Sequence, residues 1–411
     1  MTVSRSCLLL TTALVATIGL SPVEAKGRGQ RIVAVADIHG SFSGLVGILE
    51  AAGLIDQNLD WSGGDSILAQ TGDFLDRGPE VRKVMDLLMK LEAQAPMQGG
   101  EVQVALGNHE VANLLTQFQL NWVTPEICAT FSDESSAAAR EAAFESWWSW
   151  RKRFPRLAPK TREHWMETFP LGFLEYQEAL GPDGKYGKWL RGLPVVLRIQ
   201  DTIFMHAGIS KDYSHLSVKE INKRVRRELR TFDALKERLV KAELIFPFFS
   251  IYQISEAIGL RAQQLNADPQ AGSAEERTLL YNSWKELQGM RWLSSEDGPL
   301  WYRGYSRLSD SKLKRLFFDL KKKYQVERFV VGHTPVRPPT IQSRLGGRFF
   351  LIDTGMLRSH YHGRASALQI QDGAVSEIYP IKKDPSPTNA ESSSTPTRLR
   401  RVPGLDIRLA S

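Results

Sequence analysis

The sequence has almost no cysteine, because Cys7 and Cys128 are the only two in 411 residues. Cys7 lies in an N-terminal segment that we expect to be removed, so the mature chain keeps one thiol and cannot form an internal disulfide. Cys7 also lacks the small-residue context of a lipidation site. Stability must therefore come from a buried core, and the apolar content of 42% with 24% charged residues is typical of a globular protein.

The apolar run Cys7–Leu20 is too short to span a bilayer comfortably. Arg5 supplies a positive charge before the run, Pro22 ends it, and Ala25 offers a small residue where a signal peptidase cleaves. These features predict that residues 1–25 are a signal peptide, with export to the periplasm or beyond and no stable membrane anchor after cleavage. An uncleaved anchor or a buried N-terminal helix is the alternative interpretation.

The charge is not concentrated in a way that indicates nucleic acid. A net charge of +7 arises from 53 basic and 46 acidic residues, which are dispersed along the chain without an RNA- or DNA-binding motif. We therefore expect no nucleic-acid partner. From about residue 382 to 411 the chain becomes rich in Pro, Ser and Thr and then basic, a composition that predicts a disordered tail.

Short apolar, β-branched runs alternate with helical patterns in the first part of the chain. This β-α-β-α order predicts a layered α/β fold with a parallel sheet. The predicted strands are Ile32–Ala36, Ile67–Gln70 and Val102–Leu106, and the predicted helices are Ser43–Ala52, Glu80–Leu91 and Glu110–Gln117.

A second set of strands follows later, and the short step Gln200-Asp201 predicts a hairpin between the first two of them. Two long segments, about 118–190 and 211–300, interrupt the strands, and we interpret them as helical insertions in one domain, residues 26–381. The first insertion holds six of the ten tryptophans. The predicted strands of the second set are Val195–Ile199, Ile203–Met205, Phe329–Val331, Phe349–Ile352 and Ala367–Ile370.

Five short motifs stand out, and nearly all of them directly follow an apolar run. Ligands of open α/β sheets gather where strands end, so we expect these motifs to converge in space. Glycines beside them allow sharp turns and close approach of the backbone. The motifs are Asp37-Ile38-His39-Gly40, Gly72-Asp73-Phe74-Leu75-Asp76-Arg77-Gly78, Gly107-Asn108-His109-Glu110, His206-Ala207-Gly208 and Gly332-His333-Thr334.

Carboxylates and imidazoles together suit zinc, iron or manganese better than calcium, which prefers oxygen cages. Two metals about 3.5–4 Å apart need a bridging carboxylate. Asp73 occupies the central motif and is the residue that we expect to bridge them. Each motif alone is weak, but all five in this order at strand ends predict a metal site.

This series resembles the phosphoprotein phosphatase branch of the calcineurin-like metallophosphoesterases from roughly Arg31 to Ile370. Ala36 and Ala207 replace glycines of the family pattern, and neither change removes a ligand. The segment 298–304, with Arg303, is similar to the arginine-bearing motif of the bacterial Shewanella-like phosphatases. The resemblance implies two mixed β-sheets packed as a sandwich and flanked by helices.

The resemblance also implies roles for the site residues. A hydroxide held between two metals (Mn, Fe or Zn) would attack the phosphorus of a phosphomonoester. His109 would protonate the leaving group and Asp76 would orient His109, while Arg77 and Arg303 would grip the phosphate oxygens. The implied ligands are Asp37, His39 and Asp73 for one metal, and Asp73, Asn108, His206 and His333 for the other.

These implications predict a phosphatase for a phosphorylated protein, on phosphotyrosine or on phosphoserine and phosphothreonine, or for a small phosphomonoester. Aryl substrates are favoured by family analogy, and Trp147 and Trp148 are candidates for an aromatic wall. His360 and His362 follow a strand end and are candidates to line the site, whereas His164 and His215 are expected to be exposed.

Two alternatives remain open. The first is a dinucleoside polyphosphate hydrolase with the same metal site, which His206-Ala207-Gly208-Ile209 favours and the presence of Asp76 and Glu110 disfavours. The second is a binding scaffold without activity, which would be expected to lose ligands, although all six ligand positions and His109 are present. Turnover on phosphotyrosine, phosphoserine and diadenosine substrates, together with metal content, separates these readings.

Overall fold

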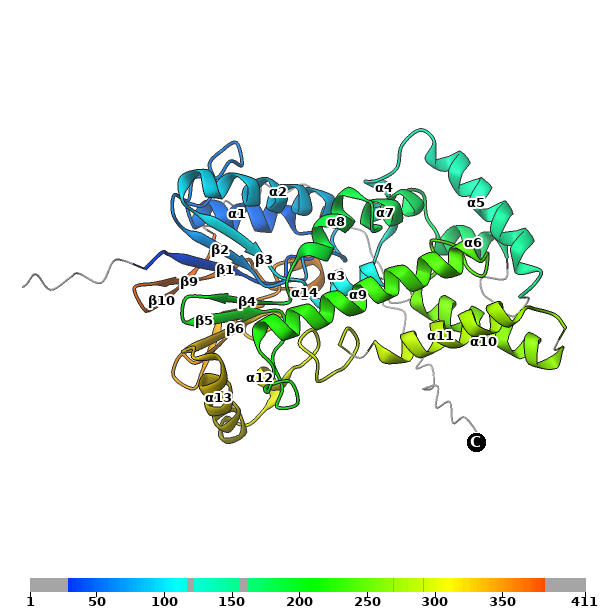
Figure 1. The fold of residues 1–411 in the computed structure, drawn as a ribbon. Helices are drawn as coiled ribbons and strands as arrows, with labels where there is room; N and C mark the ends of the chain where they lie inside the picture. Colours follow the sequence, from blue (N-terminus) through cyan, green and yellow to red (C-terminus); the bar gives the residue numbers. More distant parts are fainter. Residues whose placement is uncertain (1–28, 117–121, 155–160, 269, 291, 381–411) are drawn as a thin grey trace, which may run out of the picture. The chain divides into compact units, whose positions relative to one another are not determined.

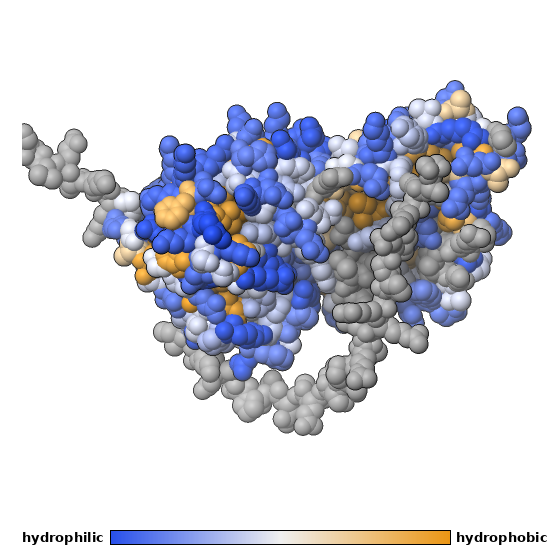
Figure 2. Space-filling view, turned by 90° about the horizontal axis from the view of Figure 1, so that it is seen from below, coloured by the Kyte–Doolittle hydropathy of each residue, from blue (hydrophilic) through white to orange (hydrophobic). Residues whose placement is uncertain are grey.

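The computed structural model describes residues 29–116, 122–154, 161–268, 270–290 and 292–380. The predicted signal peptide, 1–25, and the predicted tail, 382–411, lie outside these residues. Within the described ranges, no helix is both long and apolar enough to cross a membrane. Hydrophilic residues cover most of the face shown in Figure 2, with smaller apolar areas between them.

Two five-stranded mixed sheets pack against each other (Figure 1). The first has the order β10-β9-β1-β2-β3, in which β1, β2 and β3 are parallel to one another. Strand β9 runs antiparallel to β1, and β10 runs antiparallel to β9. The predicted parallel arrangement of the first three strands is therefore confirmed. Its strands are β1 (Ile32–Val35), β2 (Ile67–Gln70), β3 (Glu101–Val104), β9 (Ala367–Gln371) and β10 (Ala374–Ile378).

The second sheet has the order β4-β5-β6-β8-β7. Strands β5, β6 and β8 are parallel, while β4 forms the predicted hairpin with β5 through a turn in which Gln200 has φ 52°. Its strands are β4 (Val196–Ile199), β5 (Thr202–Met205), β6 (Arg328–Val331), β7 (Gln342–Arg344) and β8 (Phe349–Leu351).

The central strands, such as β1, β5 and β8, are buried along their whole length because both faces are covered. In β1, Ile32 and Ala34 belong to the apolar cluster between the sheets, which also holds Phe204, Val330 and Leu368. Alternate residues of the same strand, such as Val33, belong instead to the larger cluster shared with the helices. Both sides of each sheet are thus sealed, which directs the polar motifs to the strand ends.

Helices cover the outer faces of the sandwich (Figure 1). Helices α1 and α2 lie over the first sheet, and Phe317 of α13 packs its ring against Phe329 and Phe349 of the second. These elements are α1 (Phe42–Ala51), α2 (Val81–Gln94), the 3₁₀ turn η1 (Ala95–Gln98), α12 (Gly304–Arg307), α13 (Asp310–Tyr324), and the short helices α3 (Asn108–Leu114) and α14 (Arg358–Tyr361) beside the strand ends.

The two predicted insertions are helical where the structure describes them. Most of their helices lie beyond the strand ends, on the side of α3 (Figure 1). The first contains α4 (Pro125–Ala129), α5 (Ser136–Arg151), α6 (Arg162–Thr168), α7 (Phe173–Leu180) and α8 (Lys185–Gly192), and the second contains α9 (Val218–Lys241), α10 (Ile251–Ala267) and α11 (Ala274–Gly289).

Sequence periodicity missed two strands, β7 and β10. Both are edge strands with largely exposed side chains, so they lack the apolar pattern on which the prediction rests. The helix expected at Glu110–Gln117 begins earlier, at Asn108, because Glu110 accepts a hydrogen bond from the backbone N–H of Gly107 and so caps the first turn. Gln117 itself lies outside the described residues.

Candidate metal centre

Five strands of two sheets deliver polar side chains to one buried cluster. Asp37 follows β1, Asp73 follows β2, Asn108 follows β3, His206 follows β5 and His333 follows β6. All five side chains are buried. The expectation that these motifs meet at the strand ends therefore matches the geometry.

Three lone-pair atoms surround Nε2 of His206. Asn108 Oδ1 lies 2.8 Å from it, His333 Nδ1 lies 2.9 Å away and Asp73 Oδ2 lies 3.2 Å away. One imidazole proton satisfies only one of these contacts, so the arrangement is suited to a shared cation. Asp73, His206 and His333 accordingly form a candidate metal-binding group.

His39 forms a second group on the other side of Asp73. Its Nε2 lies 3.8 Å from Asp73 Oδ2 and 3.9 Å from Asp37 Oδ2. Its Nδ1 lies 3.0 Å from the carbonyl oxygen of Leu75, an acceptor that holds the proton on Nδ1 and leaves Nε2 as the ligand atom. Ligand atoms of His39, Asp73 and His109 all lie within 4.8 Å of one another, so Asp73 is common to both groups.

A direct hydrogen-bond link joins the two sheets at the cluster. The backbone N–H of His333 donates to both oxygens of Asp37, at 3.0 and 3.2 Å, across 296 residues of sequence. Glycine is required beside it, because a Cβ on Gly332 would lie 2.2 Å from Asp37 Oδ1. Gly107 is constrained in the same way, since its Cβ would lie 2.1 Å from Asp73 Oδ1.

The charges of the cluster fit a cation. Burial, with repulsion from Asp353 and Asp73, raises the pKa of Asp37 well above its usual value. Burial also lowers the pKa of His39 and His333, which favours neutral imidazoles. Neutral imidazoles with buried carboxylates are a donor set for zinc, iron or manganese, and a cation would offset the cost of crowding these carboxylates.

A hydrogen-bonded chain runs back from His109. Its Nδ1 lies 2.7 Å from Asp76 Oδ2, and the other oxygen of Asp76 accepts from Asn113 Nδ2 at 2.8 Å. Tyr176 in turn donates to Asn113 Oδ1 at 2.6 Å. Burial lowers the pKa of His109, but the charge of Asp73 and the hydrogen bond to Asp76 outweigh it, so this pKa lies above its ordinary value.

Both predicted arginines border the cluster. Arg77 Nη2 lies 3.4 Å from His109 Nε2, and its Nη1 lies 2.5 Å from His360 Nε2. Arg303 is held by its Nη1, which donates to the carbonyl oxygen of His333 at 2.7 Å and to Thr334 Oγ1 at 2.9 Å. Arg77 thus lies beside the His109 side chain, and Arg303 is anchored to the segment that carries His333.

Sequence reasoning included Glu110 in the third motif without assigning it a role, and it did not name Asp353 as part of the site. Glu110 accepts backbone N–H bonds from Asp73, Phe74, Leu75 and Gly107 at 2.7–2.9 Å, and so fixes the loop that carries Asp73. Asp353 is buried after β8, and its Oδ2 has no hydrogen-bond partner among the described residues. Its place at a strand end was the available signal.

The aromatic residues beside the cluster differ from those expected. Trp147 is fully buried and packs against Trp148 and Trp165, so it cannot form an open wall. Trp122, from the same insertion, stacks on His109 with ring centroids 3.8 Å apart. The ring centroids of Trp301 and Trp122 are 6.4 Å apart, and the carbonyl oxygen of Trp301 lies 3.2 Å from His333 Nε2.

The remaining histidines separate into two groups. His164 and His215 are exposed, as expected. His360 reaches Arg77, and the neighbouring Tyr361 hydroxyl lies 2.9 Å from His39 Nε2. The segment after β8 therefore borders the site, although His362 itself is exposed.

The motif backbone is unusual as well. His39, Asp73, Asp76, Arg77 and His333 all have φ between 49° and 69°. This left-handed conformation is uncommon outside glycine and clusters at functional sites. The sharp turns therefore occur at the functional side chains themselves, in addition to the flanking glycines.

Comparisons with known proteins agree with this geometry. A family model described as calcineurin-like phosphoesterase matches residues 30–337. Shewanella-like protein phosphatase 1 of Plasmodium berghei is 27% identical over 379 residues, which are 90% of this chain and 80% of that protein. Shewanella-like protein phosphatase 2 of Arabidopsis thaliana is 28% identical over 211 residues, or 48% of this chain and 51% of that protein.

Among solved structures, the cold-active protein-tyrosine phosphatase of a psychrophilic Shewanella species shares the fold. The TM-score is 0.51 at 22% identity, over 85% of this chain and 80% of that one. The predicted pair of mixed sheets flanked by helices is confirmed, as is the predicted resemblance. The chain belongs to the calcineurin-like phosphoesterase family and is a metal-dependent phosphoesterase hydrolase.

Proposed function

We propose that this chain is a two-metal phosphomonoester hydrolase that acts on phosphorylated proteins. The observation that carries the proposal is Asp73, whose carboxylate belongs to two metal-binding groups, one with His39 and one with His206 and His333. Asp37 contacts both sides, because its oxygens lie 3.9 Å from His39 Nε2 and from His206 Nδ1. Asn108 completes the second group. Bound manganese, iron or zinc would supply an activated water and neutralise phosphate charge.

The chain's own residues account for binding and proton transfer. Arg77 and Arg303 border the cluster and would hold the non-bridging phosphate oxygens, for which a planar guanidinium is well suited. His109 would protonate the leaving-group oxygen from Nε2, since its Nδ1 is engaged by Asp76. Asn113 and Tyr176 keep the Asp76 carboxylate in place.

Phosphotyrosine or another aryl phosphate is the substrate class that we favour. Trp122 and Trp301 are half-buried beside His109 and His333, where a phenyl leaving group would lie. The names of the relatives, protein phosphatases and a protein-tyrosine phosphatase, support a phosphoprotein substrate. Trp122→Leu keeps an apolar side chain while removing the aromatic surface.

The deciding experiment is a substrate panel with the chain loaded in turn with manganese, zinc and iron. A phosphotyrosine peptide, a phosphoserine peptide and a diadenosine polyphosphate are compared by kcat/KM. We expect the phosphotyrosine peptide to be turned over fastest, and Trp122→Leu to reduce its advantage over phosphoserine. Faster turnover of the diadenosine substrate would favour the dinucleoside polyphosphate hydrolase instead, and no turnover with two bound metals would favour a scaffold.

We also propose that the protein is exported and acts in the periplasm or outside the cell. The supporting features are the charged, apolar and small-residue segments of residues 1–25. Intact-mass measurement of the exported chain should give an N-terminus at Lys26. An intact Met1 on protein recovered from the cytoplasm would contradict this proposal.

A further inference from the structure

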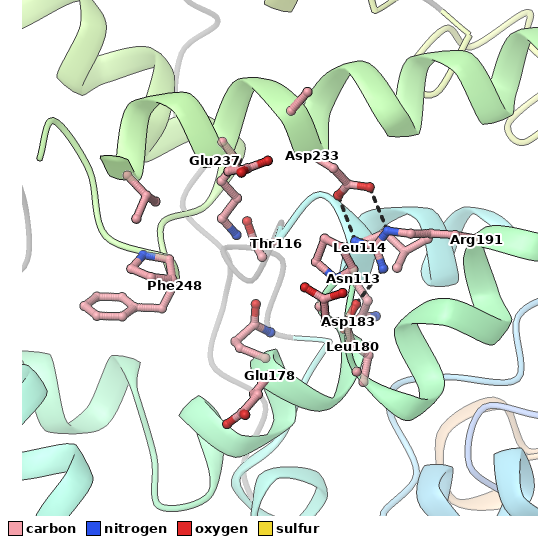
Figure 3. A pocket seen from close by; sticks show the side chains of 18 of the residues that line it. Asn113, Leu114, Thr116, Glu178, Leu180, Asp183, Arg191, Asp233, Glu237 and Phe248 are labelled. Atoms are coloured by element: carbon pink, nitrogen blue, oxygen red, sulfur yellow. Dashed lines mark hydrogen bonds and ion pairs between the residues drawn. The ribbon is translucent and has the colours of Figure 1, made fainter. Parts of the chain in front are cut away.

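A cavity of about 1160 Å³ lies among α3, α7 and α9, apart from the metal ligands (Figure 3). Its volume is slightly above the range for small-molecule sites, roughly 300–1,000 Å³. Residues of the predicted insertions form most of its wall, and the phosphatase reaction proposed above uses none of them except Asn113. The cavity therefore needs a separate explanation.

The wall of this cavity, which we call the α7–α9 cavity, is apolar over much of its extent. Leu114 comes from α3, Leu174 and Leu180 come from α7, Val240 comes from α9, and Phe248 follows α9. Such a surface favours an aliphatic or aromatic body over a hydrated polar ligand. Exposed charged residues, including Glu178, Asp183 and Glu237, are confined to the rim.

The α7–α9 cavity contains a lysine that forms no direct ion pair. Lys236 lines the cavity, is partly buried, and makes no hydrogen bond or ion pair with any described residue; its ammonium lies 5.9 Å from the centroid of the Phe232 ring, and Asp233 acts on it only through a longer-range charge interaction. Desolvation lowers its pKa to about 8. Arg191 in the same wall differs, because its Nε and Nη2 donate to the two carboxylate oxygens of Asp233 at 2.7 and 2.8 Å (Figure 3). Its charge is therefore already paired.

A second polar atom of the cavity also lacks a partner. Gln177, on α7, has a buried Nε2 that makes no hydrogen bond to any described atom. A buried donor left unsatisfied costs free energy, and a ligand acceptor would remove that cost if the side chain turned toward the cavity, because Nε2 is closed to solvent as it stands. The wall thus presents one ammonium group and a broad apolar surface, with an unsatisfied amide donor directly behind it.

We propose that the α7–α9 cavity binds an aliphatic monocarboxylate. The carboxylate would pair with Lys236 and, after the Gln177 side chain turns, accept a hydrogen bond from its Nε2, while the aliphatic chain packs on Leu174, Val240 and Phe248. A monoanion fits better than a phosphate dianion, because the rim carboxylates would repel the second charge. This site is independent of the proposed metal chemistry, so either proposal can fail without the other.

The test is a calorimetric titration of the full chain with decanoate below its micelle concentration. Decanol and decyltrimethylammonium, which carry the same chain with no charge and with a positive charge, are the matched comparisons. We expect decanoate to bind about tenfold more tightly than decanol, as a charge-assisted hydrogen bond allows. Equal affinity for the three compounds, or no decanoate binding, would overturn the proposal.

Two substitutions locate the binding site. Lys236→Met removes the ammonium and keeps an unbranched side chain, so its preference for decanoate over decanol should disappear. Lys241→Met at the rim makes the same chemical change outside the interior and should leave that preference intact. Thermal unfolding checks that both variants fold. Retained preference in a folded Lys236→Met variant would show that the carboxylate binds elsewhere and would refute the assignment.

Discussion

Glu110 builds the site although it lies outside the proposed metal ligands. Its two carboxylate oxygens accept four backbone N–H groups, three from the loop that carries Asp73 and one from Gly107. Buried backbone donors without acceptors are costly, so this single side chain determines the shape of the loop. Glu110 therefore contributes to folding as well as to the arrangement of the site.

We predict that Glu110→Gln lowers the free energy of unfolding by about 3 kcal/mol, because an amide cannot accept from four donors and presents its own N–H groups to them. Urea denaturation measures the change. Glu101→Gln, which alters an exposed side chain, is the control and should be nearly neutral. A neutral Glu110→Gln variant would show that the loop holds its shape by other means.

Asp76 is the residue whose proposed role is most specific. Asp76→Asn should lower kcat about 10²–10⁴-fold, because an amide no longer stabilises protonated His109 or holds its ring. Elemental analysis should still find close to two metals per chain, since Asp76 is not among the proposed ligands. Loss of metal in this variant would mean that Asp76 has been given the wrong role, and Asp86→Asn, at the exposed Lys185 pair, controls for charge.

Residues with a position in a sequence motif were predictable, whereas residues that act through tertiary contacts were not. Asp37, Asp73 and His333 stand at strand ends and carry their chemistry in their side chains. Trp122 is different, because it reaches His109 only through the fold of the first insertion. Asp353 also stands at a strand end, but no pattern of neighbouring residues distinguished it from an ordinary turn.

Helix α9 shows how an element of an insertion supports the sandwich. Its Asn222 side chain accepts the backbone N–H groups of Val195 and Val196, both at 3.0 Å, and donates to the carbonyl of Val196 at 2.8 Å. The side chain therefore substitutes for a neighbouring strand at the edge of β4. In this way the helix covers an edge that would otherwise be open to another chain.

We predict that Asn222→Ala destabilises the protein by about 2 kcal/mol, since three buried hydrogen bonds lose their partner. Chemical denaturation measures this loss. Lys223→Ala, at the next and exposed position of α9, should change stability little. If both substitutions had the same small effect, the contact between Asn222 and β4 would not contribute to folding.

The free energy of unfolding should also depend on pH, because α9 carries Lys236. Its pKa of about 8 in the folded chain is below the ordinary 10.5, so between these values the unfolded state binds more protons. Stability should therefore rise with pH across this window, by about 2 kcal/mol after allowance for partial exposure. Lys236→Met should be more stable at pH 7 and should lack this rise, as denaturation at pH 7–10 would show. A similar rise in Lys236→Met would assign it to other groups.

The buried elements were predictable because their patterns are strong. Strand β2 has the predicted bounds, Ile67–Gln70, and the other predicted strands differ only at their ends. Strands β7 and β10 are polar and exposed, so nothing in their composition marks them as strands. They form because a neighbouring strand offers its free edge, which is a tertiary condition.

At the scale of the whole molecule, the candidate metal centre lies where two sheets meet. Asp37 and Asp73 come from the first sheet, while His206 and His333 come from the second. Cations held by all four residues would fasten the sheets together. Which sheet each strand joins could not be read from the sequence, since β9 pairs with β1 from the far end of the chain.

We predict that metal removal lowers global stability as well as abolishing turnover. Binding at a hundredfold excess over Kd contributes about 2.7 kcal/mol per site, provided that the unfolded chain does not bind metal. Calorimetry of chelated and reloaded protein should therefore show a lower Tm without metal. An unchanged Tm with activity lost would indicate that the sheets are held together without help from the cations.

The distance in sequence between Asp37 and His333 also has a consequence for biosynthesis. When the ribosome has added Val331, the first three parallel strands are complete. His333, whose backbone N–H donates to Asp37, has not yet been added. A nascent chain released from the tunnel up to that point lacks the final imidazole and strand β9. Completion of the proposed ligand set is thus confined to the last stage of translation or later.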